Sequence, residues 1–245
     1  MPFAPESKSY SDTRKRTSAS YVKFSTSYRV VLRILDENAV LAWKHWIGEA
    51  NGGKGLMAVC PNVTPQTKVC PIERSLAGLA KDDPKYLDRR AKKRYLVNVL
   101  DRTPYTVCDS CSNQTPGKEC VHCGADLKKN TFTPLNRVKI LESGPQLFVQ
   151  TLNAVDKMQQ EEFGINITEY DITFSASGIG RDRKLAAIPG AQSVISEQDL
   201  LDPETNEPQK VFDLHLLSEP TSVEEVEAML RGATIDELNI LKGIV

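Results

Sequence analysis

Long hydrophobic runs are absent from this sequence. Hydrophobic residues make up 40% of its 245 residues, and none of their stretches approaches the roughly 18 residues that a membrane-spanning helix needs. The first 20 residues, "MPFAPESKSYSDTRKRTSAS", also lack the apolar segment of a secretory signal peptide. We therefore expect no membrane contact, and six cysteines that are reduced thiols or metal ligands and not disulfides.

The patterns that identify common enzyme classes are absent as well. There is no Gly-Lys-Ser/Thr loop for nucleotide phosphates, no zinc-protease helix with paired histidines and no nucleophile elbow. Histidine, the commonest general acid or base, occurs only at His45, His122 and His215. We therefore expect a protein that is not an enzyme.

The formal net charge of the whole chain is −1, but the charges are distributed unevenly. Residues 1–190 carry 28 Lys and Arg against 20 Asp and Glu, a net charge of +8, whereas residues 191–245 carry 3 against 12, a net charge of −9. This split is typical of a polyanion-binding body with an acidic C-terminal segment, and an unevenly charged solvated surface is the alternative.

Hydrophobic periodicity predicts a mainly β protein with helical additions. A flexible basic arm is expected at 1–27, a core at 28–190 and an acidic segment at 191–245. Two short helices are expected in the acidic segment, with capping boxes of Ser222 with Glu225 and of Thr234 with Glu237. The helices of that segment are expected to pack on the body more than on a partner. A five-stranded barrel of the OB type with additional elements would accommodate the strand count. Strands are expected at 27–35, 39–48, 54–60, 94–101, 136–144, 169–180 and 183–190, and helices from Ile72, from Asp83-Pro84 and over 145–158.

A Cys-rich insert at 104–130 carries the clearest chemical pattern in the chain. Two CxxC pairs stand eight residues apart, and each pair can point two thiolates at one ion, so that together they complete a tetrahedron. Four thiolates leave no open coordination position, so we predict one structural zinc in a ribbon. His122 lies between two ligands and is expected at the surface. The predicted ligands are Cys108, Cys111, Cys120 and Cys123.

A second stretch, "VCPNVTPQTKVCPIE", resembles an interrupted metal site, because Glu73 stands where a zinc-binding chain would usually have another cysteine. Together with "KHWIG" before it and "AKKRYLVNVLDR" after it, this stretch resembles the core of T-even-type bacteriophage single-stranded DNA-binding (helix-destabilising) proteins. The resemblance covers roughly residues 14–190. The four-cysteine insert departs from that family's pattern.

The resemblance implies an OB-fold that binds single-stranded DNA cooperatively and without sequence preference. It implies a role in phage DNA replication, recombination and repair, in the cytoplasm of the infected bacterial host. It also implies a zinc site at which His45, Cys60 and Cys70 match three ligand positions and Glu73 replaces the last cysteine.

Two alternatives remain for this second set of residues. Carboxylate oxygens bind zinc, so a His/Cys/Cys/Glu site is chemically feasible. Mixed structural sites are uncommon, however, and a complete thiolate site follows 38 residues after Cys70. The sequence therefore favours a vestigial site with buried free thiols over a second zinc.

Single-strand binding needs a cationic groove for phosphates and aromatic faces for bases. So many like charges in a short segment repel one another unless they bind an anion, so we expect them to contact DNA. The candidate phosphate contacts are Lys85, Arg89, Arg90, Lys92, Lys93 and Arg94, with Arg181, Arg183 and Lys184 at an expected hairpin tip. The candidate stacking residues are Trp43, Trp46, Tyr86, Tyr95 and Tyr105, each with a core position as its alternative.

Protein partners are also implied by the resemblance. The stretch "RKRTS", formed by Arg14, Lys15, Arg16, Thr17 and Ser18, matches the basic motif with which the family contacts the neighbouring protomer on DNA. The acidic segment is expected to compete with DNA for the basic surface and to recruit replication or recombination proteins. The competing hypothesis is a zinc-ribbon transcription or primase-accessory factor that acts on duplex DNA or a polymerase.

Overall fold

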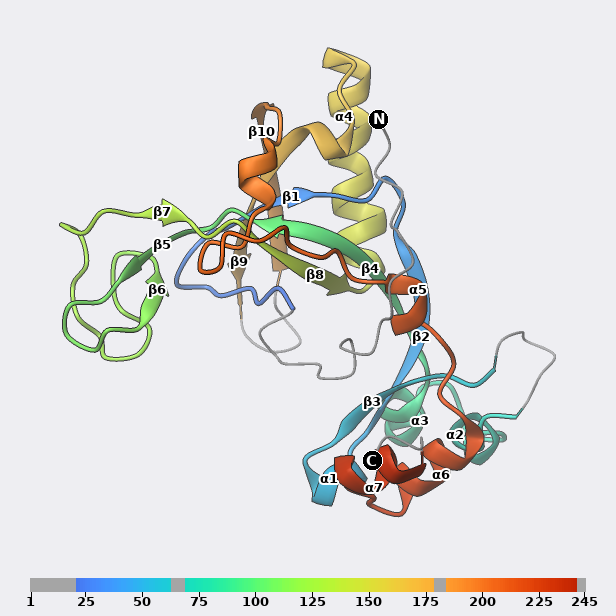
Figure 1. The fold of residues 1–245 in the computed structure, drawn as a ribbon. Helices are drawn as coiled ribbons and strands as arrows, with labels where there is room; N and C mark the ends of the chain where they lie inside the picture. Colours follow the sequence, from blue (N-terminus) through green and yellow to red (C-terminus); the bar gives the residue numbers. More distant parts are fainter. Residues whose placement is uncertain (1–20, 63–68, 179–183, 242–245) are drawn as a thin grey trace. The chain divides into compact units, whose positions relative to one another are not determined.

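The computed structural model describes residues 21–62, 69–178 and 184–241 (Figure 1). None of the helices in these ranges combines the length and the apolar composition that crossing a bilayer requires. Contacts group the chain into two compact units that interleave along the sequence. The first unit comprises Met1–Glu37, Asn98–Leu141 and Gln159–Phe212, and the second comprises Asn38–Val97, Glu142–Met158 and Asp213–Val245.

The described residues form a mainly β structure with short helices, as the sequence predicts. The strands are β1 (Val30–Ile34), β2 (Val40–Ile47), β3 (Leu56–Val59), β4 (Lys92–Asp101), β5 (Pro104–Val107), β6 (Gln114–Pro116), β7 (Thr133–Pro134), β8 (Arg137–Ser143), β9 (Tyr170–Ser177) and β10 (Lys184–Gln192). The helices are α1 (Ala50–Gly53), α2 (Pro71–Ser75), α3 (Pro84–Arg89), η2 (Gln146–Leu152), α4 (Asn153–Phe163), η3 (Ile167–Glu169), η5 (Glu197–Leu200), α5 (Leu214–Leu217), α6 (Val223–Leu230) and α7 (Ile235–Leu241).

The first unit is built on β1, which pairs antiparallel with β9 on one side and with the end of β4 on the other. Val30, Leu32 and Ile34 are all buried, as period-two alternation requires of a strand with one core face. Arg33, on the other face, is also buried because its guanidinium is paired with Asp171 at 2.8 Å. Strands β5, β6 and β7 form a separate small sheet that carries the cysteines.

The second unit contains β2, which pairs antiparallel with β3 and with the beginning of β4. Helix α3 starts where expected: the Asp83 side chain accepts a hydrogen bond from the Lys85 amide, and proline follows at the first helical position. The core of this unit gathers side chains from β2, β3, α2, α6 and α7.

The expected five-stranded OB-type barrel is not confirmed. Among the described residues, β1 to β4 and β8 to β10 form one seven-stranded antiparallel sheet, whose hydrogen-bonded order runs from β10 to β3 without closing. Closure depends on strand tilt and stagger, which alternation of apolar residues does not encode. Strand β4 contributes to both units, with residues 92–97 in the second and 98–101 in the first.

The C-terminal helices pack on the body, as expected. Ser222 and Glu225 form the predicted capping box of α6, and Thr234 and Glu237 make the equivalent hydrogen bonds ahead of α7. The apolar face of α6 is buried in the second unit, whereas α7 buries only Leu238 there and leaves Ile235 and Leu241 exposed. Helix α5, capped by Asp213, was not predicted.

Candidate metal centres and nucleic-acid interface

Two matching turns hold the four cysteines of the insert. In the first turn the Ser112 amide donates to the Cys108 carbonyl at 2.7 Å, and in the second the Gly124 amide donates to the Cys120 carbonyl at 2.9 Å. The residue after each CxxC pair adopts a left-handed backbone, with φ of 59° at Ser112 and 76° at Gly124. Such a turn brings the two thiols of a pair to the same side of the chain.

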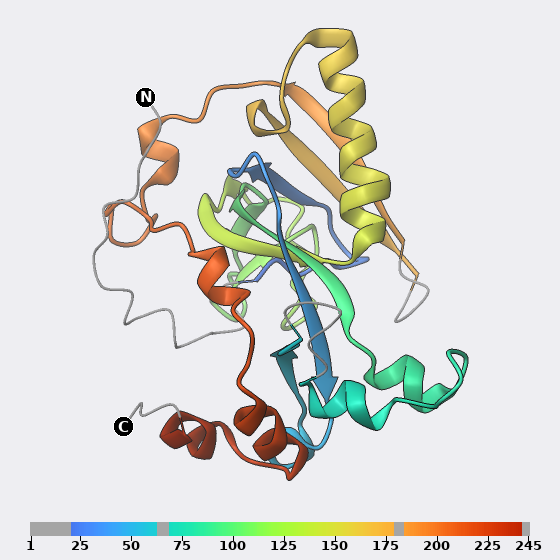
Figure 2. The ribbon, with the colours of Figure 1, turned by 90° about the vertical axis from the view of Figure 1, so that its right-hand side faces the viewer.

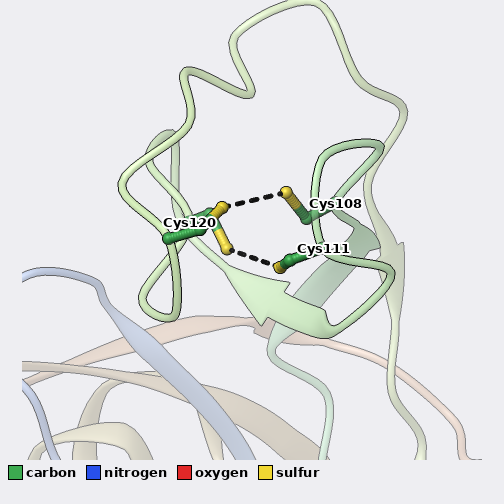
Figure 3. Close-up of side chains that lie close together, drawn as sticks. Cys108, Cys111 and Cys120 are labelled. Atoms are coloured by element: carbon green, nitrogen blue, oxygen red, sulfur yellow. Dashed lines mark hydrogen bonds between the residues drawn. The ribbon is translucent and has the colours of Figure 1, made fainter.

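The sulfur atoms lie where a tetrahedral metal site needs them (Figure 3). All four are within 4.8 Å of one another, and the Cys108–Cys123 and Cys111–Cys120 sulfur pairs are 3.6 Å apart. Zinc–sulfur bonds of about 2.3 Å place the sulfurs of a tetrahedron about 3.8 Å apart, whereas a disulfide needs about 2.05 Å. The four cysteines therefore fit a metal ion, as predicted for zinc.

The surroundings of the four cysteines point to a structural role. Cys108 and Cys120 are buried together with Leu127, and only a few partly buried side chains pack against this small cluster. Hydrogen bonds from the backbone and side chain of Asn113 lower the pKa of Cys111. The adjacent residue Asn113 thus stabilises a thiolate at Cys111. The apolar core of the insert is too small to keep the insert folded without a metal. His122 is exposed, as expected.

A second cluster combines His45 of β2 with Cys60, which follows β3, and Cys70, which precedes α2. Their ligand atoms are within 4.8 Å of one another, and all three residues are buried. The Nδ1 atom of His45 lies 2.8 Å from the carbonyl oxygen of Arg89. A proton on Nδ1 donates to that oxygen, so Nε2 keeps its lone pair toward the cysteines, as in most metal-bound histidines.

Distances in this second cluster also fit a tetrahedral metal. Bonds of about 2.3 Å to sulfur and about 2.0 Å to nitrogen give a sulfur–nitrogen edge of about 3.5 Å, and Cys70 Sγ lies 3.5 Å from His45 Nε2. The Oε1 atom of Glu73 lies 3.7 Å from the same nitrogen, but the ligand atoms that all lie within 4.8 Å of one another are those of His45, Cys60 and Cys70 alone. The hydrogen bond from Cys60 lowers the pKa of Cys70, which favours the thiolate form that a metal binds.

Burial decides what this second cluster can do chemically. His45 and Cys70 are 0% exposed and Cys60 is 6% exposed, so no substrate can reach a metal held there. A catalytic zinc needs an open, accessible coordination position. A metal at this cluster would therefore be structural. The donor set fits such an ion, and the alternative of a vestigial site stays open.

An exposed aromatic and cationic face lies on β2 and β4. Trp43 pairs with Lys93, and Leu41 pairs with Tyr95, so these four side chains point to the same side of the sheet. Trp43 is 48% exposed and Leu41 is 43% exposed. The Lys93 ammonium lies 5.4 Å from the centre of the Tyr95 ring. The Tyr95 ring also stacks on the ring of Phe148 in η2, with 5.4 Å between the ring centres. We call these four residues of β2 and β4 the Trp43 face.

The other predicted DNA contacts are distributed more widely. Trp46 lies three positions along β2 and therefore on the opposite face, and its indole ring lies against Gly55, where a Cβ would approach the ring carbon Cζ2 to 2.1 Å. Tyr86 packs on the core of the second unit. Tyr105 is half-buried in β5, and burial raises its pKa. Arg89 is paired with Glu49.

Several predicted contacts remain unpaired cations or lie outside the described ranges. Among the described residues, no carboxylate forms an ion pair with Lys85, Arg90, Lys92, Lys93 or Arg94. Lys184 starts β10 in the first unit. The candidates Arg181 and Arg183, and the protomer-contact motif of Arg14, Lys15, Arg16, Thr17 and Ser18, lie outside the described residues.

Two residues of this interface escaped the sequence reasoning. Leu41 stands two positions before Trp43, so the period of a strand could have placed both on one face. Phe148 supports the Tyr95 ring from a helix 53 positions later in the chain, and no local pattern signals that contact.

Comparisons with known proteins leave the family of this chain open. No protein-family model matches the sequence, and no curated protein matches it. The resemblance to phage single-stranded DNA-binding proteins therefore stays a prediction that rests on the quoted residues.

Proposed function

We propose that this protein binds single-stranded DNA cooperatively and without sequence preference, in phage DNA replication, recombination and repair. The observation that carries the proposal is the Trp43 face. It combines a half-exposed indole, a supported tyrosine ring and an ammonium group on one side of two paired strands.

This combination suits single strands because their bases are unstacked and can lie on aromatic rings, each stacked base contributing roughly 1–3 kcal/mol. Tyr95 is held by Phe148, so its ring is already positioned before DNA arrives. The five cations between Lys85 and Arg94 that form no ion pair with another described residue would contact the phosphates, whose charge relieves their mutual repulsion. Stacking on aromatic rings and contacts to phosphates do not read the edges of the bases, so they give affinity for DNA without sequence preference.

The remaining parts of the proposal rest on the sequence. The proposal includes an OB-type arrangement of the strands and contacts between neighbouring protomers through residues 14–18. It also includes recruitment of replication proteins by the acidic C-terminal segment and a location in the cytoplasm of the infected host. Structural zinc in the ribbon supports the proposal only indirectly, because such ribbons also occur in factors that bind duplex DNA or a polymerase.

Replacing Trp43 by Leu should weaken binding to oligo(dT) by roughly 5- to 150-fold, the loss of about one stacked base. The matched control is Trp46→Leu, because Trp46 is 49% exposed on the same strand but lies on the opposite face. Fluorescence anisotropy with oligo(dT) and with a duplex of equal length measures both affinities. Equal losses in the two variants, or tighter binding of duplex than of oligo(dT) by the unmodified protein, would favour the zinc-ribbon factor.

Neutralising Lys85, Lys92 and Lys93 together with Gln should reduce the salt dependence of oligo(dT) binding. Each phosphate contact to a single strand contributes about −0.7 to the slope of log affinity against log salt concentration, so three lost contacts should flatten the slope by about 2. A triple replacement of the exposed lysines Lys118, Lys129 and Lys210 removes the same charge elsewhere. Titration at several salt concentrations compares them, and an equal slope change in both would place the phosphate contacts away from α3 and β4.

A further inference from the structure

The C-terminal helices share a hydrophobic core with the second metal cluster. Cys60 and Cys70 are packed in one group of buried side chains with Val226 and Met229 of α6 and Leu238 of α7. Both ribbon views show α6 and α7 beside α1, the turn that connects β2 and β3 (Figures 1 and 2). The wall around the two cysteines is therefore built partly by residues more than 150 positions later in the chain.

A set of hydrogen bonds fixes this contact next to Cys60. The Val59 amide donates to Thr221 Oγ1 at 3.0 Å, and the Thr221 amide donates back to the Val59 carbonyl at 3.1 Å. At the other end of α6, the Asn51 amide donates to the Ala233 carbonyl at 2.8 Å. Because the first pair lies one residue before Cys60, the start of the helix pair sets where the Cys60 thiol can lie.

Two other residues of the cluster are held by contacts outside the C-terminal helices. The Arg89 carbonyl orients His45, and Glu73 Oε1 accepts a hydrogen bond from the Ala91 amide at 3.1 Å. These contacts hold His45 and Glu73 independently of the C-terminal helices. Cys60 is the ligand candidate that also depends on the C-terminal helices: its amide donates to the Trp43 carbonyl at 2.7 Å, and the Thr221 hydrogen bonds restrain the residue before it.

We infer that the helix pair α6–α7 and a metal ion at His45, Cys60 and Cys70 stabilise each other. A bound metal fixes Cys60 and the core on which α6 packs, and α6 in turn holds Cys60 ready for the metal. Coupling of this kind is reciprocal, so each raises the apparent affinity of the other by the same factor. The inference depends on the donor set described above and not on DNA binding.

The coupling would make the acidic segment respond to metal. Residues 213–241 contain seven Asp and Glu and a single Arg. While metal is bound, the helix pair stays folded on the body, with Val226, Met229 and Leu238 buried against it. When the metal leaves, this packing loosens, so the second cluster acts as a metal-dependent latch on the acidic helix pair.

The test uses the full-length protein and Co²⁺ as the probe, with no DNA present. Met229→Ala removes packing from α6 without touching a candidate ligand, and Ile240→Ala makes a similar truncation at a 65% exposed position of α7. Titration against a competing chelator, followed by the cobalt–thiolate absorption, resolves the two sites. We expect Met229→Ala to weaken the second site by roughly 5- to 150-fold, the usual range of coupling, with the ribbon site and Ile240→Ala unchanged.

A milder variant and a reverse measurement complete the test. Thr221→Val removes only the side-chain hydrogen bond to Val59, and should weaken the second site even if Met229→Ala fails to fold. Conversely, Cys70→Ser should speed amide hydrogen exchange across residues 223–241, whereas Cys111→Ser should not. Binding of Co²⁺ at the ribbon alone would overturn the inference, as would an unchanged second site in both helix variants or unchanged exchange in Cys70→Ser.

Discussion

Removal of residues 221–245 should unfold the second unit. The truncation takes away Val226, Met229 and Leu238, which are 0%, 6% and 5% exposed, and uncovers the core around Cys60 and Ile72. Burying three side chains of this size contributes roughly 4–9 kcal/mol, which is comparable to the about 5–15 kcal/mol that stabilises a whole domain. The cooperative transition of this unit should therefore be lost in urea and thermal melts followed by circular dichroism.

Oligo(dT) binding by the truncated protein distinguishes two roles of the C-terminal segment, packing on the second unit and electrostatic competition with DNA. An acidic segment that only competed with DNA would leave a truncated protein folded and tighter in binding at low salt. Loss of the second unit would instead disorganise β2 and β4 and abolish oligo(dT) binding. A folded, tighter-binding truncation would show that α6 and α7 are dispensable for the fold and would contradict the packing described here.

A charge-only variant is the matched control for the truncation. Glu224→Gln and Asp236→Asn remove two exposed charges of the truncated segment and leave the buried side chains of α6 and α7 intact. Their combined effect on stability should be small, because exposed charges contribute little. If the acids compete with DNA, this variant should bind oligo(dT) more tightly at low salt and equally at high salt.

The sequence predicted those features that depend on residues close together in the chain, such as metal-binding turns and helix caps. The CxxC spacing placed Cys108 and Cys111 opposite Cys120 and Cys123, because a knuckle is closed by hydrogen bonds within a few residues. Asp83 and Ser222 were recognised as caps for the same reason. Such features need no knowledge of the rest of the fold.

Contacts between distant segments were beyond reach of the same reasoning. Nothing near Val226 indicates that it will be buried with Cys60, and nothing near Phe148 indicates Tyr95 as its partner. The open sheet is a further example. The residues of β1 and β9 predict that each is a strand, but their pairing and the lack of closure of the sheet depend on the whole chain. A mixed donor set such as His45, Cys60 and Cys70 becomes recognisable only when the fold brings it together.

Replacing Cys111 by Ser should remove one equivalent of zinc from the purified protein and loosen residues 104–130. The apolar cluster of this insert contains only Leu127 beside Cys108 and Cys120 as fully buried members. Structural zinc sites of four thiolates supply about 10–16 kcal/mol of apparent binding free energy, which exceeds what so small a core can contribute. Elemental analysis gives the zinc content, and amide hydrogen exchange reports on the insert, while exchange in β1 and β9 should be unchanged.

Ser112→Gly, one position along the chain, is the matched control for Cys111→Ser. It keeps all four thiolates and relieves the left-handed backbone at Ser112, whose φ is 59°; this conformation costs a residue other than glycine about 1 kcal/mol. We therefore expect full zinc content and equal or slower exchange across the insert in this variant. Full zinc retention in Cys111→Ser, or zinc loss of equal size in Ser112→Gly, would show that the four sulfur atoms are not the ligands of one ion, and that the 3.6 Å sulfur separations reflect packing of free thiols.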